Sequence, residues 1–236
     1  DTAPNYGGGE SERVLGEALE GRRDQVVLVS KFGHRVDGRK DLSADTFPDR
    51  FGATLERLKT GYVDVLLLHN PDAAVYEGTD PIWEALEEAR RKGLLRHYGA
   101  SLDFASEIEA CLSNTGSEVL EIFFNILHQD VRRAFPLARE KGAGLIAKIP
   151  LDSGWLTGKY DASSRFEGVR GRWSGEDIAR RAGLVKQLDW LTDDGSALAC
   201  KAIAYCLSYD EVGCVIPGIR TMDHLEKNVE AAGCTI

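Results

Sequence analysis

Several features that mark specialised classes of protein are missing from this 236-residue sequence. No apolar run reaches the roughly 18 residues that a membrane-spanning helix needs, so no membrane partner is expected. The net charge is −9, whereas general nucleic-acid binders carry positive charge for the phosphates, so no nucleic-acid partner is expected either. The histidines are widely separated and form no ligand motif, and we expect no metal site.

Closely spaced cysteine pairs are also absent. The cysteines are scattered and form no CxxC motif: Cys111, Cys200, Cys206, Cys214 and Cys234. An odd, scattered set in mostly apolar surroundings is typical of buried free thiols. Because free thiols persist in a reducing compartment, the pattern predicts a cytoplasmic protein without disulfides.

The composition is that of an ordinary globular protein, with 43% hydrophobic and 28% charged residues. Short apolar segments alternate with segments of helical periodicity, which predicts an α/β fold with a parallel sheet covered by helices. The expected strands are 26–32, 63–69, 96–101, 119–127, 145–149 and 212–216. The expected helices are 13–20, 43–60, 81–93, 104–112, 131–141, 174–191, 197–207 and 222–232. We expect loops at 70–78 and 150–173.

Polar side chains stand where the first two expected strands end. Lys31 lies near the end of the first strand, and His69 closes the second. Asp1 and Tyr6 precede them on a glycine-rich loop that leads into the first helix. Each residue alone has an ordinary structural explanation, such as a packed tyrosine, a core histidine or a buried ion pair. Because parallel strands lie about 4.8 Å apart, the residues are expected to converge, and together they predict a reactive site.

These residues fall within stretches that resemble the aldo-keto reductases. The stretches are DTAPNYGGGESERVLGEAL, VSKF, VDVLLLHNPD, LDSGWLTGKY and VIPGIR followed by LEKN, in the family's order and spacing. The resemblance implies a TIM-type (β/α)8 barrel that binds NADP(H) without a Rossmann domain. Compared with that barrel, the first strand, the first helix and most of the second strand are absent, so we expect a single barrel domain over 1–236 that is incomplete at its N-terminus.

The resemblance places the family's catalytic tetrad on Asp1, Tyr6, Lys31 and His69. A phenol titrates near a pKa of about 10, and a nearby ammonium ion lowers that value. Lys31 can supply the ammonium ion, and Asp1 can pair with Lys31. His69 can donate an N–H to the carbonyl oxygen as negative charge develops there. Tyr6 is then the proton donor to a carbonyl substrate.

A second set of residues is implied to bind the cofactor. The segment 216–220 leaves a strand at Gly218 and leads into a helix, where N–H groups and Arg220 can meet a phosphate. The implied set is Ser101, Glu121, Leu151, Gly154, Lys159, Gly218, Arg220, His224 and Asn228. Three positions around the nicotinamide depart from the family: Leu102 replaces an asparagine, Glu121 a glutamine, and Lys148 an aromatic residue.

The expected function is that of an NADP(H)-dependent oxidoreductase that reduces a small aldehyde, ketone or sugar-like carbonyl. The alternative is a cofactor-binding regulatory protein on the same scaffold, because the family includes potassium-channel β subunits. The intact tetrad favours the enzyme, whereas the absent strand and the altered nicotinamide positions favour the alternative. The expected partner is a small-molecule carbonyl or alcohol substrate.

Overall fold

The computed structural model describes the backbone of residues 1–236 and every side chain except those of 169 and 170. The strands follow one another in the sheet in chain order, and β1 to β4 pair in parallel. The strands are β1 (Val29–Phe32), β2 (Val63–His69), β3 (Leu95–Leu102), β4 (Val119–Phe123), β5 (Gly144–Lys148) and β6 (Val212–Ile216). The α/β class is therefore confirmed, in a strand order consistent with a (β/α)8 barrel.

The chain divides into two compact units. Unit 1 comprises residues 1–122 and 131–145, and unit 2 comprises residues 123–130 and 146–236. The α-helices are α1 (Glu10–Ala18), α2 (Phe47–Arg57), α3 (Ala73–Tyr76), α4 (Ile82–Arg91), α5 (Ala105–Asn114), α6 (Phe135–Lys141), α7 (Gly175–Lys186), α8 (Leu198–Leu207) and α9 (Met222–Glu230). The 3-10 helices are η1 (Tyr6–Gly9), η2 (Arg23–Gln25), η3 (Ala44–Thr46), η4 (Asp130–Ala134), η5 (Asp152–Thr157), η6 (Gly168–Arg172), η7 (Asp189–Thr192) and η8 (Ala231–Gly233). The single barrel domain stays a prediction.

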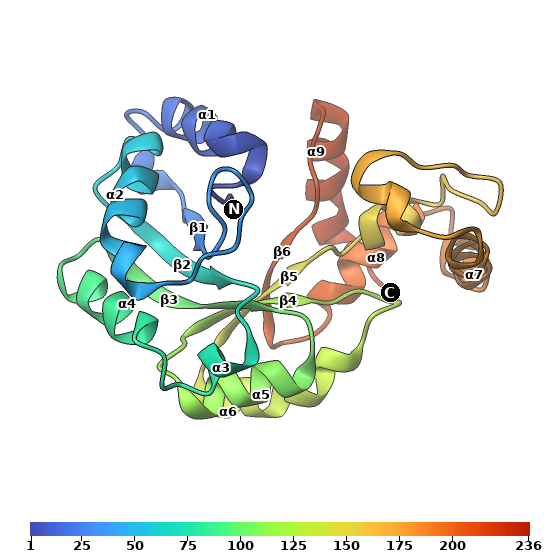
Figure 1. The fold of residues 1–236 in the computed structure, drawn as a ribbon. Coiled ribbons are helices and arrows are strands. Elements are labelled where there is room, and N and C mark those ends of the chain that lie inside the picture. Colours follow the sequence, from blue (N-terminus) through green and yellow to red (C-terminus); the bar gives the residue numbers. More distant parts are fainter. The chain divides into compact units, whose positions relative to one another are not determined.

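The core of unit 1 follows from the apolar strands. Residues 63–68 of β2 are all buried, and Leu66, Leu67 and Leu68 are fully inaccessible to solvent. Helices α2 and α4 lie side by side on the outer face of this part of the sheet (Figure 1). The apolar positions of α4, at three- and four-residue spacing, face inward, as the sequence pattern predicts. The first three strands therefore form a well-packed platform for the residues at their ends.

A buried ion pair fixes the helix that follows the N-terminal loop. Glu12 of α1 is fully buried; it accepts a hydrogen bond from Ser30 at 2.9 Å and pairs with the Arg57 guanidinium at 2.7 Å. Helices α1 and α2 approach so closely that a Cβ at Gly16 would lie 2.5 Å from the Arg57 carbonyl oxygen. The loop that carries Tyr6 is therefore joined to a helix that is held against both β1 and α2.

Some element boundaries differ from the predictions for local reasons. The fourth strand ends at Phe123 because Asn125 and His128 form a tight antiparallel bridge, which ends the extended segment. The predicted loop 70–78 contains α3, which Trp83 anchors by donating a hydrogen bond to the Val75 carbonyl at 2.7 Å. The first helix begins at Glu10, where left-handed Gly9 forms its N-cap.

The loop 150–173 of unit 2 is anchored by an aromatic cluster. Trp155 is fully buried, and its neighbours include Tyr160, Phe166 and Trp173. The ring centroids of Trp155 and these three aromatics are 5.5–5.8 Å apart. Helix α7 adds Ile178 and Val185 to the same cluster. The long excursion is thus a packed substructure with its own hydrophobic centre.

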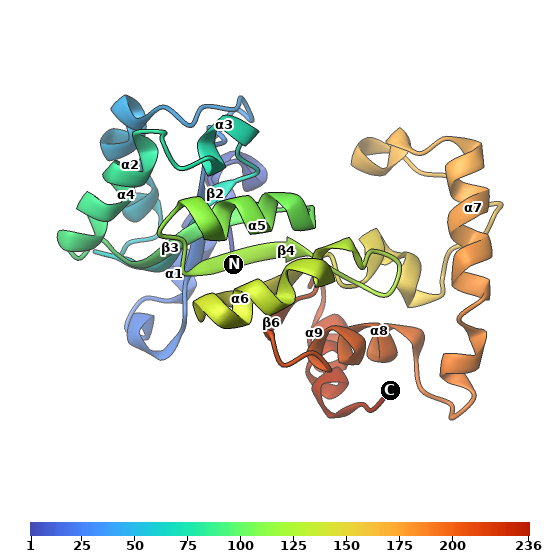
Figure 2. The ribbon, with the colours of Figure 1, turned by 90° about the horizontal axis from the view of Figure 1, so that it is seen from below.

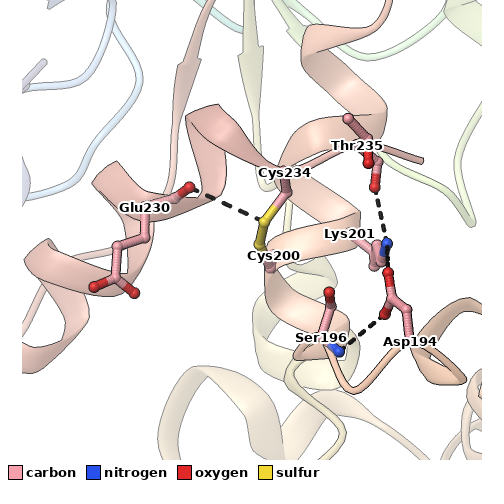
Figure 3. Close-up of a disulfide and its surroundings, with 7 residues drawn as sticks. All are labelled: Asp194, Ser196, Cys200, Lys201, Glu230, Cys234 and Thr235. Atoms are coloured by element: carbon pink, nitrogen blue, oxygen red, sulfur yellow. Dashed lines mark hydrogen bonds and ion pairs between the residues drawn. A yellow bond between two sulfur atoms is a disulfide. The ribbon is translucent and has the colours of Figure 1, made fainter.

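The cysteines correct one prediction. Cys200 of α8 and Cys234, just after η8, form a disulfide, and their Cα atoms are 6.3 Å apart (Figure 3). Cys214 is exposed, so only Cys111 and Cys206 are the buried free thiols that were expected. Burial raises the pKa of Cys206 to about 12, which makes this thiol unreactive. A separation of 34 residues leaves no local signal for the disulfide.

A lysine beside the disulfide also links α8 to the segment that carries Cys234. Lys201 of α8 is buried; it donates to Asp194 at 2.5 Å and to the backbone carbonyl of Thr235 at 2.8 Å (Figure 3). Helices α8 and α9 lie side by side near the C-terminus (Figure 2). The disulfide and the lysine therefore hold the end of the chain against α8.

No helix in the described part of the chain combines the length and apolar character that crossing a membrane requires.

Candidate active site

Lys31 occupies the centre of the candidate site in unit 1. Its side chain is 1% exposed, and its ammonium group donates to both carboxylate oxygens of Asp1 at 2.7 Å. A third contact, of 3.3 Å, reaches the backbone carbonyl of Thr2. The Thr2 N–H donates to Val29 of β1 at 3.0 Å, which places the start of the chain beside the strand that carries Lys31. The predicted pairing of Asp1 with Lys31 is therefore present.

Tyr6 borders the lysine, and His69 borders Tyr6. Tyr6 lies on η1, where Gly7 and Gly8 have the positive φ angles of 60° and 64° that a side chain disfavours. The Tyr6 ring centroid is 5.3 Å from the Lys31 ammonium and 6.1 Å from the His69 ring centroid, which it meets edge to face. The structure therefore brings together all the residues of the predicted tetrad, each from a different segment of unit 1.

Glu121 of β4 is a second carboxylate at Lys31. Ser101 of β3 donates a hydrogen bond to Glu121 Oε1 at 3.0 Å, and Glu121 Oε2 lies 3.2 Å from the Lys31 ammonium. In a flat sheet, the three spacings from β1 to β4 would separate these strands by about 14 Å. The contact therefore requires the sheet of unit 1 to curve, as the wall of a barrel does.

A histidine that the sequence reasoning overlooked also lies at this site. The His34 and His69 ring centroids are 4.6 Å apart. Burial, followed by the positive charges of Lys40 and Arg50, lowers the pKa of His34, so its ring is neutral near pH 7. The available signal was its position three residues after Lys31, in the loop that leaves the end of β1.

The predicted phosphate-binding residues belong to unit 2. Gly218 and exposed Arg220 lie between β6 and α9, and Thr221 caps α9 by accepting a hydrogen bond from the His224 N–H at 3.2 Å. Asn228 donates to the Gly218 carbonyl at 3.5 Å. The half-buried side chains His224 and Asn228 are one turn apart on α9. The helix N-terminus and the guanidinium provide the positive potential that a phosphate requires.

The other predicted cofactor-binding residues of unit 2, Leu151, Gly154 and Lys159, lie in or beside η5. The backbone there is strained, with positive φ at Asp152 (44°) and Ser153 (57°). Asp152 is buried and contacts Arg181 and His128. Burial raises the pKa of Asp152, but the His128 hydrogen bond and the Arg181 charge outweigh that effect and leave the pKa below its ordinary value.

The residues present fit a nicotinamide cofactor. Among the described side chains, Glu121 Oε2 is a buried acceptor that no hydrogen-bond donor satisfies, which suits a carboxamide N–H. Leu102 stands where the family has an asparagine. Its apolar side chain is 1% exposed and lies in the core, and it has no amide group to offer the cofactor. Lys148 is half-buried at the end of β5.

Across the described residues, no group of three or more His, Cys, Asp or Glu side chains is arranged to hold a metal ion.

Comparison with known proteins finds a matching family model, related sequences and a similar solved structure. The model of the aldo/keto reductase family matches residues 1–235. The chain is 30% identical to a probable voltage-gated potassium channel subunit beta of Arabidopsis thaliana, over 98% of this chain and 76% of the relative. It is 26% identical to the NADH-specific methylglyoxal reductase of Escherichia coli, over 98% and 77%. The structure of aldo-keto reductase AKR11C1 from Bacillus halodurans, in its holo form, is similar with a TM-score of 0.84 and 27% identity, over 100% of this chain and 76% of that one.

Proposed function

The chain belongs to the aldo/keto reductase family, and from this premise we propose that it is an NADP(H)-dependent oxidoreductase of small aldehydes, ketones or sugar-like carbonyls. The observation that carries the proposal is the Asp1–Lys31 ion pair, in which Lys31 is buried and its ammonium lies 5.3 Å from the centroid of the Tyr6 ring. The cofactor supplies the hydride, and the protein supplies placement and the proton.

The tetrad residues have distinct roles in this proposal. Tyr6 donates its phenolic proton to the carbonyl oxygen, and the Lys31 ammonium stabilises the phenolate that remains. Asp1 holds Lys31 in place by accepting its hydrogen bonds through both carboxylate oxygens. His69, whose ring meets Tyr6 edge to face, donates an N–H to the same carbonyl oxygen and stabilises the charge that develops there.

We propose that residues of unit 2 bind the phosphates of the cofactor. Leu151, Gly154 and Lys159 cover the pyrophosphate, and Gly218, Arg220, His224 and Asn228 bind the adenosine end. Ser101 and Glu121 of unit 1 contact the carboxamide. A guanidinium binds a 2′-phosphate through two charge-assisted hydrogen bonds, which a 2′-hydroxyl cannot match. One relative is NADH-specific by name, so the proposed preference for NADP(H) rests on Arg220 of this chain.

Arg220→Ala is expected to weaken NADPH binding by about ten- to more than a hundredfold, because the lost charge-assisted hydrogen bond contributes about 1.5–3 kcal/mol. NADH binding should change little, since NADH lacks the phosphate. Fluorescence titration of both cofactors measures the two affinities. Arg180→Ala is a matched control, because Arg180 is also an exposed arginine of unit 2, pairs with Asp177 on α7 and has no proposed cofactor role. Equal losses for NADPH and NADH would assign Arg220 a structural role.

A regulatory, cofactor-binding protein is the second candidate, favoured by the 30% identity to a probable potassium channel β subunit. Both candidates bind the cofactor, and only the enzyme turns over. Incubation with NADPH and a panel of methylglyoxal, 4-nitrobenzaldehyde, cyclohexanone and erythrose separates them. Continuous cofactor consumption with at least one carbonyl is expected for the enzyme. Binding of NADPH without consumption across the panel favours the regulatory candidate.

A further inference from the structure

Lys31 is balanced by two carboxylates, and one of them lies where the family has a neutral residue. Asp1 and Glu121 both lie within 3.2 Å of the ammonium group. The three short contacts that Lys31 makes with hydrogen-bond geometry go to Asp1 and to the Thr2 carbonyl. Glu121 Oε2 is close but outside hydrogen-bond geometry, so its effect on Lys31 is that of charge.

Both oxygens of the Glu121 carboxylate face a hydrogen-bond donor or a positive charge. Ser101 donates a hydrogen bond to one carboxylate oxygen, and the Lys31 ammonium faces the other. Glu121 is 3% exposed and Lys31 is 1% exposed, so water screens their interaction weakly. By formal charge, two carboxylates face one ammonium group, so the cluster of Asp1, Lys31 and Glu121 has an excess of one negative charge.

We propose that Glu121 is a positioning residue that acts on Tyr6 through Lys31, offsetting the positive charge that Lys31 presents to the phenol. The inference rests on the proposed function, and it deepens that function by naming a residue that sets the working pH range. The Tyr6 ring contacts the Lys31 ammonium and the His69 ring, and neutral His34 contacts His69. The excess negative charge opposes a phenolate at Tyr6. Tyr6 therefore stays a proton donor over a wider pH range, and the phenolate that alcohol oxidation needs forms only in more alkaline solution.

Glu121→Gln is the direct test, because glutamine keeps the shape and can still accept from Ser101 while it removes the charge. Reduction should then begin to decline at a pH about one unit lower than in the wild type. Oxidation of the corresponding alcohol should reach half its maximal rate at a pH lower by the same amount, since the same phenol controls both directions. The pH profiles of kcat/KM in the two directions measure these shifts.

A second measurement does not depend on turnover. Ultraviolet absorbance reports ionised tyrosine, and the difference between a protein and its Tyr6→Phe counterpart isolates the titration of Tyr6. This titration should move to lower pH by about one unit in Glu121→Gln. Glu121→Asp, which keeps the charge, should titrate closer to the wild type. Glu118→Gln is the matched control, because the Glu118 carboxylate is partly exposed and pairs with Arg90 and His97.

The outcomes separate the inference from the proposed function. A shifted Tyr6 titration without turnover supports the role of Glu121 and counts against the proposed reaction. Turnover with an unshifted titration and unshifted pH profiles overturns the role of Glu121 and leaves the proposed reaction standing. A change in cofactor affinity alone, with both profiles in place, also overturns it, because Glu121 would then act only as a cofactor contact.

Discussion

Tyr6→Phe is expected to lower kcat for carbonyl reduction by about 10²–10⁴-fold, because the substitution removes the only proposed proton donor. The phenyl ring keeps the edge-to-face contact with His69, so the site should keep its shape. Cofactor affinity should stay within about twofold of the wild-type value, since the phenol is assigned no contact with the phosphates. Steady-state reduction kinetics and a separate NADPH titration measure the two effects.

Tyr62→Phe is the matched control for this substitution. The Tyr62 hydroxyl accepts a hydrogen bond from Arg96 at 3.2 Å in an exposed part of unit 1, away from Lys31. Loss of this hydroxyl should leave kcat unchanged. If Tyr6→Phe reduces carbonyls as fast as the wild type does, the proton comes from another group, and the assignment of Tyr6 is wrong.

Cys234→Ser is expected to lower the free energy of unfolding by about 3–4 kcal/mol under oxidising conditions. The disulfide closes a loop between residues 34 apart, and this crosslink restricts the unfolded chain. Addition of a reductant should lower the stability of the wild type to that of the variant and leave the variant unaffected. Chemical denaturation with and without reductant measures all four stabilities.

Cys214→Ser serves as the control, because Cys214 is an exposed free thiol. Its stability should follow that of the wild type in both conditions. If the reductant does not change the stability of the wild type, Cys200 and Cys234 are not bonded in solution.

The disulfide also removes the basis of the expected cytoplasmic location. That expectation depended on free thiols, and disulfides are rare in reducing compartments.

The convergence of the proposed tetrad residues in unit 1 could be predicted because several of them occupy positions with a simple sequence signature. Lys31 and His69 interrupt apolar runs near the ends of strands, and the structure places them on neighbouring parallel strands. The tight turn after Tyr6 was readable from the glycines that follow it. Alternating apolar strands and amphipathic helices were sufficient for the α/β class, because the two periods differ.

Contacts across the curved sheet could not be read in the same way. Glu121 was predicted as a cofactor contact, but its proximity to Lys31 depends on how far the sheet bends between β1 and β4. The Cys200–Cys234 disulfide depends on the packing of η8 against α8. The helix α3 was missed because it is a single turn, held by a tertiary hydrogen bond from Trp83. Periodicity carries no information about such pairings.

Isotope transfer tests most directly whether this chain moves hydride between a nicotinamide cofactor and a carbonyl, as we propose. NADPH that carries deuterium at the reactive carbon of the nicotinamide is incubated with the protein and the carbonyl panel, and the alcohol products are analysed by mass spectrometry. We expect deuterium on the former carbonyl carbon of at least one product, in one-to-one ratio with the NADPH consumed, and labelling slowed by about 10²–10⁴-fold with Tyr6→Phe. Tight NADPH binding with no labelled alcohol from any carbonyl of the panel would contradict the proposed hydride transfer.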